Sequence, residues 1–252
     1  MKKVIYCITL LFFYSNLHAQ QFIDKAVVEY EVKANIKKTM SNDRWGEMLK
    51  DNLPEFQTSY YTFTFADNKS IYKFSRWDEK LKMPEWMKSG ENNSWYFDFN
   101  TSKINMQKEI AGSKFILDDT IPVINWKLTN ENRQIAGFNC RKAVGKIMDS
   151  VYVFAFYTDE ITISGGPCSI SGLPGMILGV TIPRMYTSYL ATKVMVNGVD
   201  VTSIKPVVVK KPYTFTSFKA YIADKSKDWF NWGDDKEEND RQRGLTLWGF
   251  YL

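Results

Sequence analysis

The fold is constrained most by short segments in which apolar and polar residues alternate, each separated from the next by turn residues. In residues 26–36, Val28, Tyr30 and Val32 alternate with charged side chains, which is the period of two of a half-buried strand. Similar segments follow at 59–75 (two runs), 94–99, 103–110, 113–119, 126–135, 140–147, 151–158, 176–182 and 188–196. Short strands at this spacing are typical of antiparallel sheets. The sequence therefore predicts a mainly β fold, as a curved antiparallel meander or a half-barrel.

Helical periodicity appears in two other stretches. Residues 42–51 read as a short helix that ends before Pro54, and the apolar residues of 216–230 fall on one helical face. Residues 234–243 fit an exposed helix end or a loop, and 245–252 fit a closing strand or a docked terminus. One or two helices should cover the sheet, which makes the fold β-rich α+β. With no internal repeat or low-complexity linker, residues 20–252 are expected to form one domain.

The first nineteen residues have the pattern of a secretory signal peptide. Lys2 and Lys3 precede an apolar centre, and small residues lead to a cleavage point near Ala19. The apolar centre is too short to span a bilayer, which needs about 20 residues. Gln20 follows the cleavage point, so no cysteine is placed there to accept lipid. We expect an exported protein, periplasmic or extracellular, that is neither a lipoprotein nor held by a transmembrane anchor.

Histidine and charge exclude several functions. The only histidine, His18, belongs to the predicted signal peptide. The mature chain therefore cannot use histidine for nucleophile activation, zinc binding or proton transfer. The 33 basic and 28 acidic residues, two of the basic ones in the signal peptide, leave a net charge of +3. No basic block stands out, so nucleic-acid binding is not expected, and no cofactor is indicated.

Cys140 and Cys168 are the cysteines that remain after cleavage of the signal peptide. Two cysteines in an exported protein most often pair, which predicts a disulfide. Two buried free thiols, or a two-thiolate metal site with further ligands from Met, Asp or Glu, are the alternatives.

The stretch GPCSISGLPGMIL (166–178) is unusually rich in glycine and proline. Pro174 and Gly175 are the central residues expected of a type II turn, and Gly172 can adopt a positive φ. Together with Leu173 they form a predicted turn (Gly172, Leu173, Pro174, Gly175) that leads into the strand at 176–182. The alternative is a rim loop whose backbone amides meet a ligand.

The same stretch resembles the GLPGLI family of exported Bacteroidota proteins, which is named for this hexapeptide. The likeness includes the preceding residues 157–161 and the segment 135–143 with Cys140. It implies export and a β-rich fold, no established activity, and neighbourhood with TonB-dependent outer-membrane transporters. Met176 replaces the second leucine of the name. Cys168 departs from the family pattern and supports a Cys140–Cys168 bond in this subgroup.

Two small constellations could carry chemistry. Tyr157, Asp159 and Glu160 could serve a histidine-free enzyme only if they converged with distant acids. Adjacent residues of a strand point to opposite faces, so Asp159 and Glu160 alone cannot flank a substrate. The run Met83, Trp86, Met87 places two thioethers near an indole, a weak candidate for binding Cu(I). Ordinary loop packing explains the same residues.

Aromatic residues make up 15% of the chain, and some lie on both faces of predicted strands. Trp95, Phe97, Phe154 and Phe156 either pack in the core under a helix or line a cavity for an apolar ligand. Exported carriers of lipid or lipoprotein share this general architecture. We therefore expect non-enzymatic binding of an apolar small molecule or a partner protein. The alternatives are an accessory subunit of a TonB-dependent transporter, with a possible link to metal uptake, and a histidine-free enzyme.

Overall fold

The computed structural model describes residues 23–42, 44–110, 112–148, 150–225 and 236–252. The predicted signal peptide at 1–19 lies outside them. Eleven strands form one antiparallel sheet. They are β1 (Ala26–Asn35), β2 (Phe56–Ala66), β3 (Lys69–Trp77), β4 (Ser94–Asp98), β5 (Lys103–Ile110), β6 (Ser113–Thr120), β7 (Lys127–Ile135), β8 (Phe138–Ile147), β9 (Val151–Thr158), β10 (Met176–Ile182) and β11 (Thr187–Met195).

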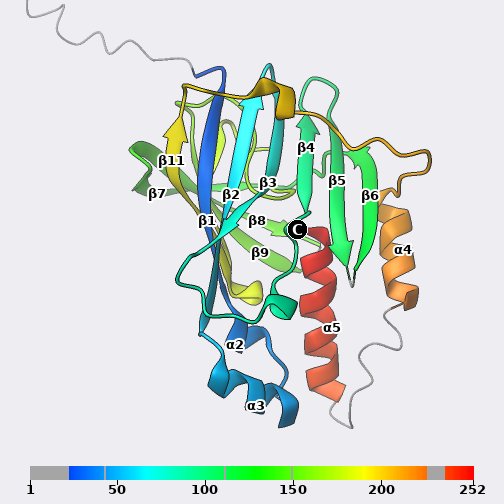
Figure 1. The fold of residues 1–252 in the computed structure, drawn as a ribbon. Coiled ribbons are helices and arrows are strands. Elements are labelled where there is room, and N and C mark those ends of the chain that lie inside the picture. The colour runs from blue at the N-terminus through cyan, green and yellow to red at the C-terminus, as the bar shows by residue number, and fades with distance from the viewer. Residues whose placement is uncertain (1–22, 43, 111, 149, 226–235) are drawn as a thin grey trace, which may run out of the picture.

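The strands form two meanders that meet in the middle of the sheet. The spatial order is β6-β5-β4-β3-β2-β1-β11-β10-β9-β8-β7. Strands that follow each other in sequence are adjacent except β6 and β7, which lie at opposite edges, and the two meanders are joined by the pairing of β1 with β11. There Val28 pairs with Val194 in an antiparallel register. The predicted antiparallel meander is confirmed, and Figure 1 shows the sheet bending around its own concave face.

The connection between the two meanders explains the curvature. Residues 121–126 lead from β6, at one edge of the sheet, to β7 at the opposite edge. Eleven flat strands about 4.8 Å apart would place these edges about 48 Å from each other. The chain from Thr120 to Lys127 reaches at most about 27 Å when fully extended. The sheet must therefore curl until its edges approach, which gives the open half-barrel.

A loop from the same chain fills the concave face. Residues 159–175, between β9 and β10, contain no regular element, yet Ile161, Ile170 and Leu173 are each at most 1% exposed. A Cβ on Gly165 would lie 2.5 Å from the ring of Phe63 on β2, so the loop touches the opposite wall. We call residues 159–175 the plug. Because a buried loop must satisfy its own backbone groups, side chains do so here. The Ser164 hydroxyl donates to the Leu173 carbonyl at 2.6 Å and the Trp126 indole N–H to the Ser171 carbonyl at 2.9 Å. Just beyond the plug, the Tyr30 hydroxyl donates to the Ile177 carbonyl of β10 at 2.6 Å.

The helices lie at the ends and edges of the sheet (Figure 1). They are α2 (Ile36–Thr39), α3 (Arg44–Asn52), α4 (Phe215–Lys225) and α5 (Lys236–Tyr251), with 3-10 turns η1 (Glu85–Met87), η2 (Pro183–Met185) and η3 (Val201–Ser203). The predicted helix at 42–51 corresponds to α3, and α4 begins where the predicted face at 216–230 begins. In the part of the chain that the structure describes, no helix is long and apolar enough to cross a membrane.

The C-terminal region decides between the two readings of residues 245–252. The closing strand is wrong, because helix α5 continues to Tyr251, whereas the docked terminus is confirmed, because Leu252 is only 4% exposed. Leu247, Trp248 and Phe250 pack against the main core from this helix. The apolar residues of 245–252 are therefore partly buried because they pack on the core from a helix, and not because they pair with an edge of the sheet.

Candidate functional site: a pocket where the sheet edges approach

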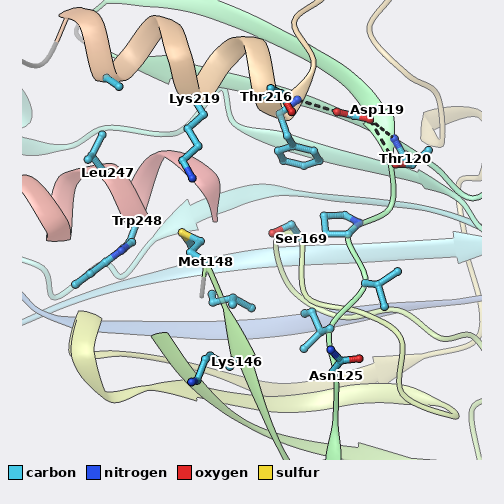
Figure 2. A pocket seen from close by; sticks show the side chains of 16 residues that line it. Asp119, Thr120, Asn125, Lys146, Met148, Ser169, Thr216, Lys219, Leu247 and Trp248 are labelled. Atoms are coloured by element: carbon cyan, nitrogen blue, oxygen red, sulfur yellow. Dashed lines mark hydrogen bonds between the residues drawn. The ribbon is translucent and has the colours of Figure 1, made fainter. Parts of the chain in front are cut away.

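A pocket of about 830 Å³ lies where the two edges of the sheet approach. It is bounded by the end of β6, the connection 121–126, the end of β8, the plug, α4 and α5 (Figure 2). We call it the seam pocket. Its lining consists of Asp119, Thr120, Pro122, Val123, Ile124, Asn125, Lys146, Ile147, Met148, Ser169, Phe215, Thr216, Lys219, Ala223, Leu247 and Trp248.

The first wall is α4, which the end of β6 fixes in place. Tyr213 forms an isolated bridge with Leu117 of β6. Asp119 accepts a hydrogen bond from the Phe215 backbone N–H at 2.8 Å, at the first turn of α4. A carboxylate at a helix N-terminus is stabilised by unpaired N–H groups and by the helix dipole. Thr216, Lys219 and Ala223 are spaced as one stripe of α4, and this stripe faces the pocket.

The second wall is the connection 121–126, which packs directly on β8. A Cβ on Gly145 would lie 2.7 Å from Ile124 and 2.8 Å from Trp126, so only glycine allows this approach. Trp126 donates its indole N–H to the Ser171 carbonyl of the plug at 2.9 Å. These contacts fix the connection against β8 and the plug, and Ile124 and Ser169 from these two segments both line the pocket.

The third wall is α5, which contributes Leu247 and Trp248. The guanidinium of Arg184 lies 4.5 Å from the centre of the Trp248 ring and supports it from outside the lining set. Most lining side chains are apolar, and the ionisable ones are Asp119, Lys146 and Lys219. Such a surface suits binding.

Sequence reasoning missed a buried lysine below the end of α5. Lys108 is 4% exposed and shares the inner face of β5 with Ile104 and Met106. Its ammonium donates to the backbone carbonyls of Leu252 at 2.5 Å and Gly249 at 3.3 Å. Burial lowers the pKa of Lys108 to about 8. The sequence feature that could have revealed it is a lysine at a position where the alternation of the predicted strand calls for an apolar residue.

The predicted disulfide is not formed. Cys140 and Cys168 are buried free thiols, and they have different neighbours. Cys168 lies in the plug, where its thiol hydrogen-bonds with Tyr189, whereas Cys140 on β8 lies 3.6 Å from the Phe138 carbonyl. Burial raises the pKa of each thiol to about 11, which keeps both protonated at neutral pH. The loop between them folds into the concave face and carries Cys168 away from its expected partner.

The four predicted ligand aromatics do not share a cavity. Trp95 and Phe97 are at most 2% exposed and lie on the inner face of β4, in the core. Phe154 and Phe156 alternate with buried Val153 and Ala155, so they lie on the outer face of β9. None of the four lines the seam pocket. Trp95 and Phe97 therefore follow the core-packing alternative, and the four aromatics do not form a shared cavity because the two pairs lie on opposite faces of the sheet.

The other predicted groups do not converge either. Met83 packs with Ile36 and Leu53 in a second small cluster, and Met87 packs against the same cluster as in ordinary loop packing, while Trp86 is 72% exposed. Among the described residues, no group of three His, Cys, Asp or Glu side chains could hold a metal ion.

The three residues considered for a histidine-free enzyme also stay apart. Tyr157 is buried, whereas Asp159 and Glu160 are exposed and lie outside the pocket lining. Glu160 accepts a hydrogen bond from the Asn139 backbone N–H at 3.1 Å, which is a turn contact.

The glycine-proline motif is structural and differs in detail from the expected type II turn. The Gly175 N–H donates to the Leu173 carbonyl at 2.8 Å, which closes a three-residue turn around Pro174. Gly175 has a φ of +141°, and a Cβ there would lie 2.0 Å from the Thr158 carbonyl oxygen. Gly172 has a φ of +90°. The turn at 172–175 ends the plug and leads into β10, and none of its four residues lines the pocket, although Ser169 of the same stretch does.

Comparisons with known proteins define the fold and leave the activity open. A family described as "Protein of unknown function (Porph_ging)" matches residues 145–179, from the end of β8 into β10. No curated protein matches the chain.

Two crystal forms of PNGF-II, in space groups C2 and P21, resemble the structure with a TM-score of 0.51 and 14% identity. Each match covers 79% of this chain, and 32% and 33% of PNGF-II respectively. An uncharacterized conserved protein from Thermus thermophilus aligns over 82% of this chain and 98% of its own length, with a TM-score of 0.38 and 8% identity. This chain thus spans about a third of PNGF-II, and the likeness concerns the fold alone. The residues that the family matches include the whole plug together with β9 and parts of β8 and β10.

Proposed function

We propose that the protein is an exported envelope protein that binds an apolar small molecule in the seam pocket without transforming it. The observation that carries this proposal is the pocket itself. Its volume of about 830 Å³ lies in the range of about 300–1,000 Å³ typical of small-molecule sites. Its lining is mostly apolar and comes from separate segments of the chain that meet only in the folded structure.

Other observations support the same proposal. The three ionisable residues of the lining include no thiol, and Asp119 is engaged at the N-terminus of α4. The concave face, where a carrier would hold a large lipid, is filled by the plug, so the ligand has to be small enough for the seam. Export and membership of the GLPGLI family are proposed on the N-terminal sequence and on the motif at 172–178.

The proposal is tested by blocking the pocket from α4. Ala223 lines the pocket, whereas Ala220, on the same helix, is exposed and does not. Protein purified from the cell envelope is examined by native mass spectrometry and by solvent extraction of bound small molecules. We expect bound material in the unaltered protein and in Ala220→Trp, and its loss in Ala223→Trp.

A second blocking variant, Thr216→Trp, guards against an effect peculiar to one site, and circular dichroism verifies that each variant is folded. Equal ligand content in the blocked and control variants would refute the proposal. Recovery of a ligand-free protein together with a stoichiometric partner would favour the partner-protein alternative instead.

A further inference from the structure

The positive charge of the protein is concentrated in one segment. Residues 200–225 contain five lysines and two aspartates, which gives a net charge of +3. This equals the net charge of residues 20–252, so the rest of that range is neutral as a whole. The lysines are Lys205, Lys210, Lys211, Lys219 and Lys225. Such a charge asymmetry is typical of a surface that meets an anionic partner.

Three of these lysines lie on a segment that the sheet holds at both ends. We call residues 205–212 the arm. Near its start, Asn105 on β5 donates to the Val207 carbonyl at 3.1 Å and accepts from the Val207 N–H at 2.8 Å. Directly after its end, Tyr213 exchanges two backbone hydrogen bonds with β6, both at 2.8 Å. Figure 1 shows the arm projecting beside β6 before α4 begins, so its position on the surface is fixed.

The arm presents apolar side chains between its lysines. Val208 is 87% exposed and Val209 is 41% exposed, although valine is usually buried. Lys205 precedes them and Lys210 and Lys211 follow, and all three are exposed. None of the three forms an ion pair with a carboxylate among the described residues. The arm therefore offers an apolar centre with uncompensated positive charge on both sides.

A lipid bilayer with anionic headgroups matches this surface. Its headgroup layer attracts lysines, and the acyl boundary beneath accepts exposed apolar side chains. A nucleic acid would also attract lysines, but residues 205–212 contain no aromatic side chain or arginine to stack on its bases. We infer that the protein attaches to an anionic lipid surface through the arm, with Val208 and Val209 inserted between the headgroups. This inference is independent of the proposed function, because no residue of the arm lines the seam pocket.

The expected strength of attachment follows from the number of lysines. Each lysine near an anionic membrane surface strengthens binding about fivefold, so the three of the arm together give roughly a hundredfold. Salt screens these charges, because the Debye length falls from about 10 Å at 0.1 M to about 3 Å at 1 M. Attachment should therefore weaken as salt is added.

Co-sedimentation with lipid vesicles tests the inference. Protein purified from the cell envelope is mixed with vesicles of phosphatidylcholine, or of equal parts phosphatidylcholine and phosphatidylglycerol. It should bind the anionic vesicles roughly a hundredfold more tightly, and the double variant Lys210→Gln, Lys211→Gln should weaken this binding about thirtyfold. The matched control is Lys80→Gln, Lys82→Gln, which removes the same charge from two exposed lysines beside Leu81 of the second small cluster and should keep the binding.

A second pair of variants tests the apolar contact. Val208→Ser should weaken binding to the anionic vesicles about three- to tenfold, whereas Val196→Ser, at an exposed valine after β11, should leave it unchanged. Circular dichroism verifies that each variant is folded. Equal binding to both kinds of vesicle, no binding to either, or the same loss in the control variants as in the arm variants would overturn the inference. Ligand binding in the seam pocket is tested with other residues and stands or fails separately.

Discussion

Replacement of Lys108 by methionine should change how stability depends on pH. Lys108 is enclosed by the core, and its ammonium bonds only to carbonyl oxygens and lies 4.7 Å from the Trp95 ring centre. Burial lowers its pKa from the ordinary 10.5 to about 8. Below pH 8 both folded and unfolded chains carry the proton, and the folded chain bears the full cost of a buried charge.

The direction and the magnitude of the pH dependence that Lys108 gives to the free energy of unfolding follow from proton linkage. Between pH 8 and 10.5 the unfolded chain binds a proton that the folded chain has released, so the free energy of unfolding rises with pH. Each pH unit contributes about 1.4 kcal/mol, or about 3 kcal/mol over the interval. Lys108→Met removes this contribution. The variant also loses hydrogen bonds to two carbonyl groups, worth about 1–3 kcal/mol, so the net change at pH 7 should be small.

Urea denaturation followed by circular dichroism, repeated from pH 7 to 9.5, measures the effect. The two thiols contribute an opposite slope above pH 9 because burial raises the pKa of each to about 11, but this slope is common to both proteins. The difference between the curves should therefore rise by about 1.4 kcal/mol per pH unit above pH 8. Lys103→Met, an exposed lysine of the same strand, should run parallel to the unaltered protein. Parallel curves for Lys108→Met would refute the assignment of a buried, destabilising ammonium.

Two further predictions concern the plug. Gly175→Ala should lower the free energy of unfolding by at least about 2 kcal/mol in thermal denaturation, since its Cβ meets the Thr158 carbonyl, whereas Gly198→Ala, with open space around it, should cost about 1 kcal/mol or less. Equal costs would contradict the tight contact. Both Cys140 and Cys168 should react with a thiol reagent only after unfolding, and a reducing agent should leave the melting temperature unchanged. A melting temperature that drops on reduction would contradict the free thiols and support the predicted disulfide.

The alternation of apolar and polar residues predicts the strands and their buried faces well in this protein. It does not predict the plug. Period-two alternation identifies the strands and places Trp95 in the core. For the large aromatics of β9 the same rule leaves core packing and a ligand cavity open, and Phe154 and Phe156 lie on the outer face, near Lys142 and Arg133. No rule based on neighbouring residues reveals that a loop from elsewhere in the chain, the plug, occupies the concave face of the sheet.

The pocket was beyond sequence reasoning for a related reason. Residues 121–126 read as an ordinary turn around Pro122, and nothing in them shows that they join opposite edges of the sheet. The pocket exists only because that connection brings the end of β6 to the end of β8. Lys108 was detectable, since a lysine among alternating apolar residues conflicts with a buried face.

The pairing of β1 with β11 has a consequence for the newly made chain. In the finished sheet β1 lies in the centre, but its partner is about 160 residues further along, with Val28 paired to Val194. At a synthesis rate of about 5–20 residues per second, that partner appears roughly ten to thirty seconds later. During this interval β1 is the open edge of the first meander and offers unpaired backbone groups to other chains. Glu29, Glu31 and Lys33 alternate along this strand, and their charges oppose the aggregation that such an edge invites.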